Sequence, residues 1–239
     1  MTEYSQTEHF AYESIVESMY WMVLHRPFEP TELIRLKSEE GGILTALRYY
    51  LARMTAELRT KRLLLRPLQL SDAEQTQRLF PQWDIVKYLN SRVPWPYPAD
   101  RVFKVYRDEI LPAIERGEEW HWTLRLEEAP DRHIGVISLH RDEWDNRGYW
   151  LGLPWQRQGL MTEAVVAVND YWFDVLGFTV LRAPKAVANV ASRRISEKTG
   201  MRLIATLERD YVSGRLPAEI WEITAEEWRN KRAQFYPAT

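Results

Sequence analysis

The hydrophobic pattern divides the chain into two regions, and the change falls near residue 57. Before it, strand alternation is absent and apolar residues recur at helical spacing, first over residues 15–23 and again over residues 43–54. Gly41 and Gly42 interrupt the chain before the second stretch. The pattern predicts an N-terminal helical appendage over residues 1–56. We interpret it as a packing or dimerisation element, which would allow a homodimer.

Residues 57–239 alternate between strand-like and helix-like segments. Short β-rich runs bounded by turn residues predict strands, over residues 61–68, 119–128, 132–140, 146–152, 178–188, 201–208 and 217–224. Helical spacing and capping residues predict helices, one that follows Ser71-Asp72 and ends at residue 80, and others over 83–89, 100–116, 159–176 and 190–199. This order predicts one α+β domain, with a mixed central sheet flanked by helices.

Composition narrows the function classes. The 32 basic and 34 acidic residues give a net charge of -2, so the chain lacks the excess of positive charge that is typical of nucleic-acid-binding proteins. No apolar run reaches the ~18 residues of a membrane span, and the first residues lack the pattern of a signal peptide. We therefore expect a cytoplasmic protein with neither nucleic-acid nor membrane partners. Because cysteine is absent, disulfides, thiolate metal sites and a cysteine acyl-enzyme are excluded, and no metal is expected.

The most informative stretch is GYWLGLPWQRQGLMTEA, in which a predicted strand enters a glycine-containing turn and continues directly into a helix. Such a turn points several free N–H groups in one direction, and the helix N-terminus adds a partial positive charge. The stretch therefore predicts an anion site. Taken alone, it would also fit a simple strand-to-helix connection in which Gly159 serves the backbone conformation.

This stretch resembles the cofactor motif Q/R-x-x-G-x-G/A of the GNAT acetyltransferases. Six consecutive residues occupy the motif, namely Gln156, Arg157, Gln158, Gly159, Leu160 and Met161. Thr162 also matches the wider family pattern, whereas Met161 departs from the usual small residue and is expected either to narrow the cleft or to turn inward. The resemblance implies that the amides of this turn bind the pyrophosphate of acetyl-coenzyme A (acetyl-CoA). It also implies that a backbone N–H near Leu151 to Leu153 polarises the thioester oxygen, where the strand is expected to bulge.

A second motif lies about 30 residues further on, in ANVASRRISEKTGMRLI. It resembles the family pattern N-x-x-S-x-x-x-x-E-K-x-G-F, and by its chemistry Asn189 can donate and accept hydrogen bonds to an amide-rich ligand such as the pantetheine arm of the cofactor. For Ser192 two interpretations stay open, a proton donor to the departing thiolate and a residue that caps the following helix. The family's usual acid, a tyrosine, is replaced by Ser196, which makes Tyr211 the second candidate donor.

The general base departs from the related pattern, which often has a glutamate where this chain has Asn146. Asp145 and Glu143 are adjacent, but as neighbours of a strand residue they would point differently and fit solvated turn charges better. Glu119 and His140 are the other candidates. A water relay or an amine that is already neutral would also suffice.

The flanks of the two motifs resemble the GNAT subgroup that contains ribosomal-protein N-terminal acetyltransferases, so that the resemblance extends over residues 57–228. It implies direct attack of an amine on the acetyl thioester. The reaction would take place in a V-shaped cleft between the third and fourth long strands, which correspond to the predicted strands over 146–152 and 178–188. The acceptor would be a protein N-terminus or a small-molecule amine. The alternatives are an aminoglycoside-type antibiotic acetyltransferase, for which an acidic acceptor wall would speak, and a non-catalytic module that binds acyl-CoA or a partner.

Eleven tryptophans are unusual for this length. Some aromatic residues could form an acceptor wall or could equally be core residues, namely Trp83, Trp95, Tyr97, Trp120 and Trp122.

Overall fold

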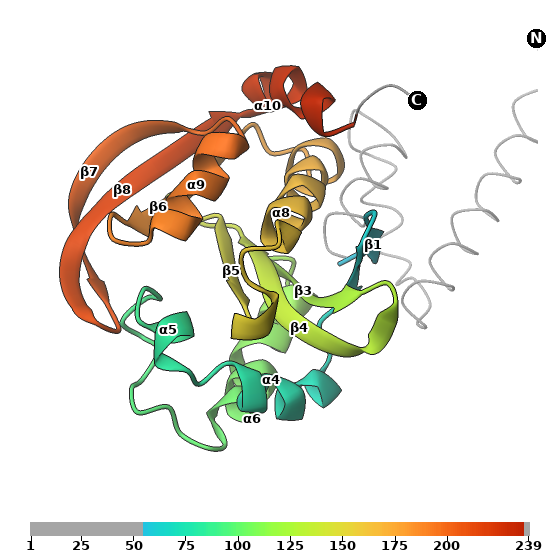
Figure 1. Ribbon diagram of the computed structural model, residues 1–239, viewed down its shortest axis with the longest axis vertical. Helices are drawn as coiled ribbons and strands as arrows, with labels where there is room; N and C mark the ends of the chain where they lie inside the picture. Colours follow the sequence, from blue (N-terminus) through green and yellow to red (C-terminus); the bar gives the residue numbers. More distant parts are fainter. Residues whose placement is uncertain (1–54, 237–239) are drawn as a thin grey trace, which may run out of the picture. The chain divides into compact units, whose positions relative to one another are not determined.

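A computed structural model of the protein describes residues 55–236, so the predicted helical appendage and the possible homodimer contact within it lie outside the described residues. The described strands form two separate antiparallel sheets (Figure 1). The first sheet has the order β1 (Leu58–Arg59), β2 (Leu63–Pro67), β3 (Glu119–Leu126), β4 (Ala129–His140) and β5 (Arg147–Leu151). The second has the order β6 (Val180–Ala186), β8 (Gly214–Thr224) and β7 (Arg202–Tyr211).

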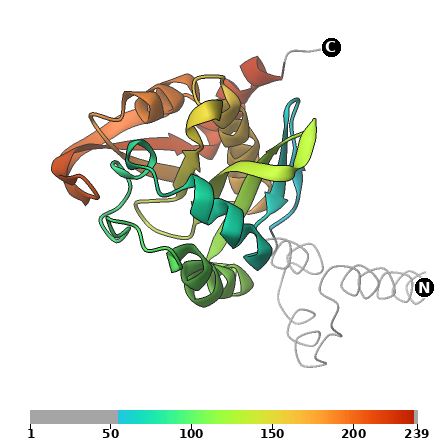
Figure 2. The same cartoon turned by 60° about the horizontal axis from the view of Figure 1, so that its bottom comes forward.

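Helices cover both faces of the first sheet. The helices and helical turns are η1 (Leu70–Asp72), α4 (Ala73–Leu79), α5 (Trp83–Val86), α6 (Arg101–Val105), η2 (Tyr106–Ile110), α7 (Leu111–Glu115), η3 (Leu153–Trp155), α8 (Leu160–Asp170), η4 (Tyr171–Val175), α9 (Val190–Lys198), α10 (Ala225–Arg232) and η5 (Ala233–Phe235). Ile137 packs into the large core with α8, whereas its neighbour Val136 packs with residues of α4 and α6. Because successive strand side chains point to opposite faces, α8 and the α4–α6 pair lie on opposite sides of the sheet. Figure 2 brings α4 to the front.

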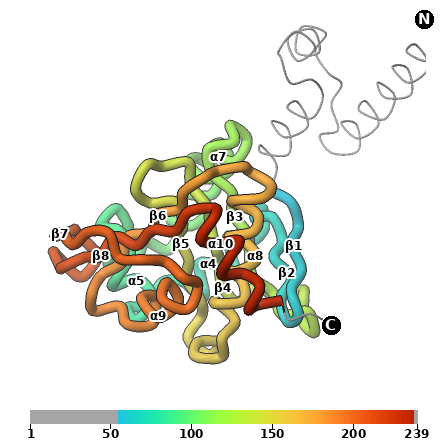
Figure 3. The backbone as a smooth tube through the Cα atoms, turned by 90° about the horizontal axis from the view of Figure 1, so that it is seen from above, coloured from blue at the N-terminus to red at the C-terminus, as the bar shows by residue number. Residues whose placement is uncertain are grey.

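This two-sided cover explains the sequence pattern of the central strands. All residues from 120 to 125 in β3 and from 133 to 139 in β4 are buried, so neither segment has a solvent-exposed face, although one buried face of β3 carries the polar residues His121, Thr123 and Arg125. The edge strand β7 instead exposes most of its side chains. Figure 3 shows β7 and β8 at one side and β1 and β2 at the other.

The predicted α+β class and most predicted elements are confirmed, and four local predictions are corrected. Residues 129–131, left between the two strands predicted over 119–128 and 132–140, begin β4, and the turn falls at 127–128. Strands β7 and β8 are longer than predicted and meet in a tight turn at 212–213. The short strand β1 and the final helix α10 were missed, although Thr224 and Glu227 form a capping box at the start of α10. Asp72, expected to cap α4, makes no cap hydrogen bond to that helix; it accepts the amide of Gln69 in the capping box of η1 and pairs with Arg66 and Arg125 at 2.7 Å.

The separation of the two sheets begins beside Asn146. Its backbone N–H donates to the carbonyl of Arg182 at 2.8 Å, and its side-chain oxygen accepts the amide of Arg182 at 2.7 Å. Beyond this double contact, β5 and β6 belong to different sheets. Asn146 thus joins the two arms of a V, in agreement with the cleft expected between these strands.

Candidate active site

The turn between β5 and α8 has an unusual backbone. After β5 the chain passes through η3, and then Arg157 and Gly159 adopt positive φ values of 64° and 78°. Glycine reaches this region without a steric penalty, whereas for Arg157 it costs about 1–2 kcal/mol. Strain of this kind is retained where the surrounding structure imposes it, most often at functional sites.

Side chains of the turn hold the turn itself. Gln156 donates from Nε2 to the carbonyl of Leu151, and Gln158 donates from Nε2 to the carbonyl of Pro154, both at 2.9 Å. Arg62 donates to the carbonyl of Gln158 at 3.0 Å. The two predicted cofactor residues Gln156 and Gln158 therefore act on the shape of the loop, which leaves the backbone amides as the groups that can face a ligand.

The amides at the start of α8 are the groups of this turn that could bind an anion. Those of Leu160, Met161 and Thr162 lie in the first turn, where a helix offers no internal acceptor. The side chains of Leu160 and Met161 are buried in the core, so Met161 turns inward and does not narrow the cleft. A Cβ atom at Gly159 would meet only Arg62, at 3.6 Å. Position 159 therefore requires glycine because of its positive φ, and not because a side chain would lack space.

Glu163 anchors this helix to the β1–β2 turn. It accepts hydrogen bonds from Thr60 at 2.6 Å and from the backbone and guanidinium of Arg62 at 2.8 and 2.7 Å. Burial raises the pKa of Glu163, but these hydrogen bonds outweigh it and hold the pKa below its ordinary value. Glu163 therefore stays ionised, and Arg62 compensates its negative charge in the first turn of α8, beside the amides that could bind an anion.

Leu151 presents its backbone to the open edge of β5. Gly152 donates to the carbonyl of Ile134 at 2.8 Å. Because hydrogen-bonded and non-hydrogen-bonded pairs alternate in an antiparallel ladder, the N–H and C=O of Leu151 point away from β4. The predicted donor thus fits at Leu151, while Gly152 is excluded. The expected bulge is absent, since β4 and β5 keep a regular register up to Leu151, and Leu153 already belongs to η3.

A cleft of about 1230 Å³ lies between the two sheets. Glu119, Asn189, Ser192 and Tyr211 of the predicted site line it, as do two other residues considered as the base, His140 and Asp145. The residues of the turn, 156–162, do not, nor do Leu151 and Leu153. The predicted residues therefore form two regions, the 156–162 turn and the cleft.

The two residues of the second motif have different roles in the structure. Asn189 is the N-cap of α9, and its side-chain oxygen accepts the amide of Ser192 at 3.2 Å. Ser192 is therefore not the cap, and its hydroxyl instead lies 2.8 Å from the hydroxyl of Tyr149 on β5. This hydrogen bond crosses the V, because it links β5 of the first sheet to α9, which follows β6 of the second sheet. Tyr149, which the sequence did not single out, is the new member of the site.

Two buried cations flank Tyr149. Lys185 on β6 lies with its Nζ 5.1 Å from the Tyr149 ring centroid, and burial lowers its pKa. Arg147 on β5 is buried against Asn169 and Met201, and burial lowers its pKa to about 10. Among the described residues, neither cation has an ion-pair partner. The wall around Tyr149 therefore carries positive charge that favours an anionic or electron-rich group.

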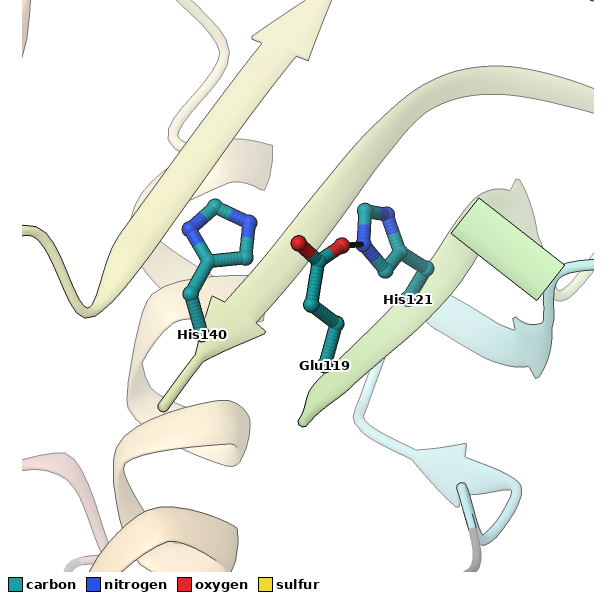
Figure 4. A group of neighbouring side chains, drawn as sticks. All are labelled: Glu119, His121 and His140. Carbon is teal, nitrogen blue, oxygen red and sulfur yellow. Dashed lines mark hydrogen bonds and ion pairs between the residues drawn. The ribbon is translucent and has the colours of Figure 1, made fainter. Parts of the chain in front are cut away.

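Glu119, His121 and His140 form a cluster (Figure 4), and two of them, Glu119 and His140, line the cleft. Glu119 accepts a hydrogen bond from His121 Nε2 at 2.6 Å, and the imidazole of His140 lies on its other side. Burial raises the pKa of Glu119, but the hydrogen bond and charge of His121 outweigh it, so the pKa is lowered overall. Burial lowers the pKa of His140. The cluster is an ionised carboxylate between two imidazoles.

The other polar candidates have limited roles. Asn146 is fully engaged in joining the sheets, and Glu143 is exposed. Asp145 is partly buried, which raises its pKa, and contacts Arg209 at 3.4 Å. The hydroxyl of Tyr211 is buried without a partner among the described residues, and burial raises its pKa to about 12. Ser196 is completely buried and does not line the cleft.

The aromatic residues divide between core and surface. Trp120 and Trp122 are 2% and 0% exposed, so they are core residues and do not form an acceptor wall. Trp83 and Trp95 are largely exposed and lie 5.5 Å apart between ring centroids. Tyr97 lines a second cavity of about 310 Å³, with other aromatic and aliphatic side chains, beside Tyr149.

No helix in the described part of the chain is long and apolar enough to cross a bilayer. Comparison with known proteins relates most of the described domain to acetyltransferases. The family model described as an acetyltransferase (GNAT) domain matches residues 62–202. A probable N-acetyltransferase of Bacillus subtilis, YjcK, is 29% identical over 160 residues, which cover 60% of this chain and 82% of that protein.

Solved structures with low sequence identity share the fold. RimJ of Mycobacterium smegmatis, in complex with a coenzyme A disulfide, aligns with a TM-score of 0.63 and 17% identity, over 75% of this chain and 90% of its own. RimL, a ribosomal α-N-protein acetyltransferase in complex with coenzyme A, aligns with a TM-score of 0.60 and 18% identity, over 71% of this chain and 98% of its own.

Proposed function

The chain belongs to the GNAT acetyltransferase family and is an acyltransferase, and from this premise we propose that it moves the acetyl group of acetyl-CoA directly to a primary amine, either a protein N-terminus or a small molecule. One observation carries the proposal. The same domain combines a turn whose amides can bind a pyrophosphate with a cleft lined by both a hydroxyl pair and a carboxylate.

Cofactor binding is assigned to the backbone of the 156–162 turn. The amides at the start of α8 would bind the pyrophosphate, with the dipole of an 11-residue helix behind them. The Leu151 amide at the open edge of β5 would donate to the thioester oxygen, where negative charge develops during attack. Asn189 uses its side-chain oxygen for the cap and keeps its Nδ2 group for the pantetheine amides.

The departing thiolate needs a proton, and the Ser192–Tyr149 pair is placed to supply it. Either hydroxyl can donate to the other, so the pair acts as one unit with the proton moving along the 2.8 Å hydrogen bond. Lys185 and Arg147, both buried near Tyr149, would stabilise negative charge on its oxygen after donation. Tyr211, whose hydroxyl has no described partner, is the alternative donor from the same cleft.

The amine must be neutral to attack. Deprotonation at pH 7 costs about 1.1 kcal/mol for an α-amine of pKa ~7.8 and about 4.6 kcal/mol for a lysine of pKa ~10.4. Glu119 faces the cleft and is the candidate to accept this proton. A single carboxylate suits an α-amine better than a lysine, because an α-amine needs less free energy to lose its proton and so depends less on the base.

The charge of the cleft argues against a polycationic acceptor. Five acidic side chains line it, namely Glu118, Glu119, Asp142, Asp145 and Asp210. Five basic side chains line it as well, namely Arg92, Arg141, Arg147, Lys185 and Arg209. An aminoglycoside site would require an excess of acidic residues, and the balanced wall supplies none. We therefore favour an acceptor with a single amine.

A panel of acceptors tests the proposed function. The panel contains peptides with different N-terminal residues, lysine-containing peptides with a blocked N-terminus, simple primary amines and an aminoglycoside, each incubated with acetyl-CoA. We expect release of the CoA thiol together with an acetylated amine for N-terminal peptides or simple amines. Thiol release without any acetylated amine would show a hydrolase, and binding of acetyl-CoA without release would support the non-catalytic alternative.

A further inference from the structure

We propose that Glu119, His121 and His140 form a binding site for a divalent transition-metal ion, with zinc as the best fit. Within the described part of the chain, this is the one group of three such side chains whose ligand atoms all lie within 4.8 Å of one another. The sequence analysis predicted no metal, on the ground that the chain contains no cysteine.

The strand register brings the three ligands together. Glu119 and His121 are two residues apart on β3 and therefore point to the same face. His140 is the cross-strand partner of Glu119 on β4, so it stands directly beside it. Figure 4 shows the carboxylate between the two imidazoles. All three ligands thus come from adjacent ends of two paired strands, which is a rigid support.

The distances fit a metal after small side-chain rotations. Metal–ligand distances of about 2.0–2.2 Å place neighbouring ligand atoms of a tetrahedral zinc on the order of 3.4 Å apart. Glu119 Oε2 and His121 Nε2 are 2.6 Å apart, so they would separate slightly. His140 would approach from within 4.8 Å. These changes involve side-chain torsions and leave the β3–β4 register intact.

An outer contact already orients one imidazole. His140 Nδ1 lies 3.3 Å from the carbonyl oxygen of Asp145. Donation from Nδ1–H to this carbonyl leaves the lone pair of Nε2 free, and metal-bound histidines are commonly held in this way. A ligand set of two histidines and one glutamate is the type that zinc adopts with its fourth position open. Since Glu119 and His140 line the cleft, that position would face the cleft.

A bound ion has a consequence that rests on the proposed function. If Glu119 accepts the proton of the acceptor amine, a metal that takes its lone pairs removes this acceptor. Zinc would then inhibit acetyl transfer without displacing acetyl-CoA, whose binding turn lies outside the cleft. The site would therefore make turnover sensitive to free zinc.

Binding is tested directly with Co²⁺ as a spectroscopic substitute for zinc, in the full chain and without acetyl-CoA. We expect one Co²⁺ per chain, with the visible absorption of a four- or five-coordinate site, and displacement by Zn²⁺. Glu119→Gln and His140→Gln should each weaken binding by at least about 100-fold, since loss of even an outer partner costs 10–100-fold. Glu118→Gln is the matched control, because it changes an adjacent carboxylate that pairs with Arg116, and it should bind as the wild type does.

Two results would overturn the site. One is the absence of stoichiometric Co²⁺ binding by the full chain. The other is binding that survives in both Glu119→Gln and His140→Gln while thermal melting shows that the variants are folded, because the ion would then lie elsewhere. Neither result depends on catalysis, so a failure of the metal site is distinguishable from a failure of acetyl transfer.

Discussion

The turn at 156–162 and the cleft between the sheets offer a ligand different kinds of groups. The turn uses the backbone: its glutamine side chains bind its own carbonyls, two of its side chains are buried, and the amides are left for the cofactor. The cleft uses side chains from distant strands, such as Glu119 of β3, Tyr149 of β5 and Ser192 of α9. Substitutions should therefore affect the turn through conformation and the cleft through lost functional groups.

The largest effect should come from removing the carboxylate of the cleft. Glu119→Gln keeps the size of the side chain but cannot accept the proton, so we expect kcat to fall by about 10²- to 10⁴-fold, the usual contribution of a general base. The affinity for acetyl-CoA, measured by calorimetry, should stay unchanged. Glu118→Gln should leave kcat unchanged. Full activity of Glu119→Gln would move proton acceptance to water or to His140.

A glycine pair tests whether the turn works through conformation. Gly159→Val places a β-branched residue at a φ of 78°, which costs about 1–3 kcal/mol locally and should weaken acetyl-CoA binding by roughly 10- to 100-fold. Gly177→Val creates the same strain at a φ of 75°, at the end of η4 and with no neighbouring atom within 4 Å. It should lower the melting temperature but not the affinity. Equal affinities in the two variants would remove the turn from the cofactor site.

The hydroxyl pair should show a smaller effect on kcat, because water can replace a lost donor. Ser192→Ala and Tyr149→Phe should each lower kcat by at least about tenfold, with little change in acetyl-CoA affinity. If the two hydroxyls act as one unit, the double variant should be scarcely worse than either single one. Simple multiplication of the two losses would show independent roles, and normal turnover in both single variants would leave Tyr211 as the donor.

The smallest effect concerns the cap of α9. Asn189→Ala removes the hydrogen bond to the Ser192 amide and should cost about 1 kcal/mol of stability, or about 2–4 °C in melting temperature. Thr224→Ala removes the corresponding cap of α10, far from the site in the sequence, and should cost a similar amount. Only Asn189→Ala should also weaken acetyl-CoA binding. Equal affinities would limit Asn189 to a structural role.

The same contrast explains what sequence alone could predict. The 156–162 turn is contiguous, and its need for a positive φ leaves a visible glycine, so both its place and its helix were predictable. The V between β5 and β6 followed from the family resemblance. Tyr149 was not predictable as a member of the site, because its partners Ser192 and Lys185 come from α9 and β6. His121 was missed for a similar reason, since only the β3–β4 register sets it near His140.

Even at positions that the sequence did single out, it could not predict what each side chain contacts. Sequence could not decide whether Met161 faces the cleft or the core, because a methionine suits both. Nor could it distinguish Asn189 from Ser192 as the cap of α9, since both residue types cap helices well. These choices depend on which side chain finds a partner across the fold, and the hydroxyl of Tyr149 provides that partner for Ser192.

The most direct test of the account is calorimetric titration of acetyl-CoA into the full chain. The account predicts binding of one acetyl-CoA per chain and a matching rise in melting temperature, by a few kcal/mol of stabilisation when the ligand is in large excess over its Kd. It also predicts that Glu119→Gln binds as tightly as the wild type, while Gly159→Val binds more weakly. Absence of heat and of thermal stabilisation at millimolar acetyl-CoA would contradict the assignment of the 156–162 turn and, with it, the proposed transferase activity.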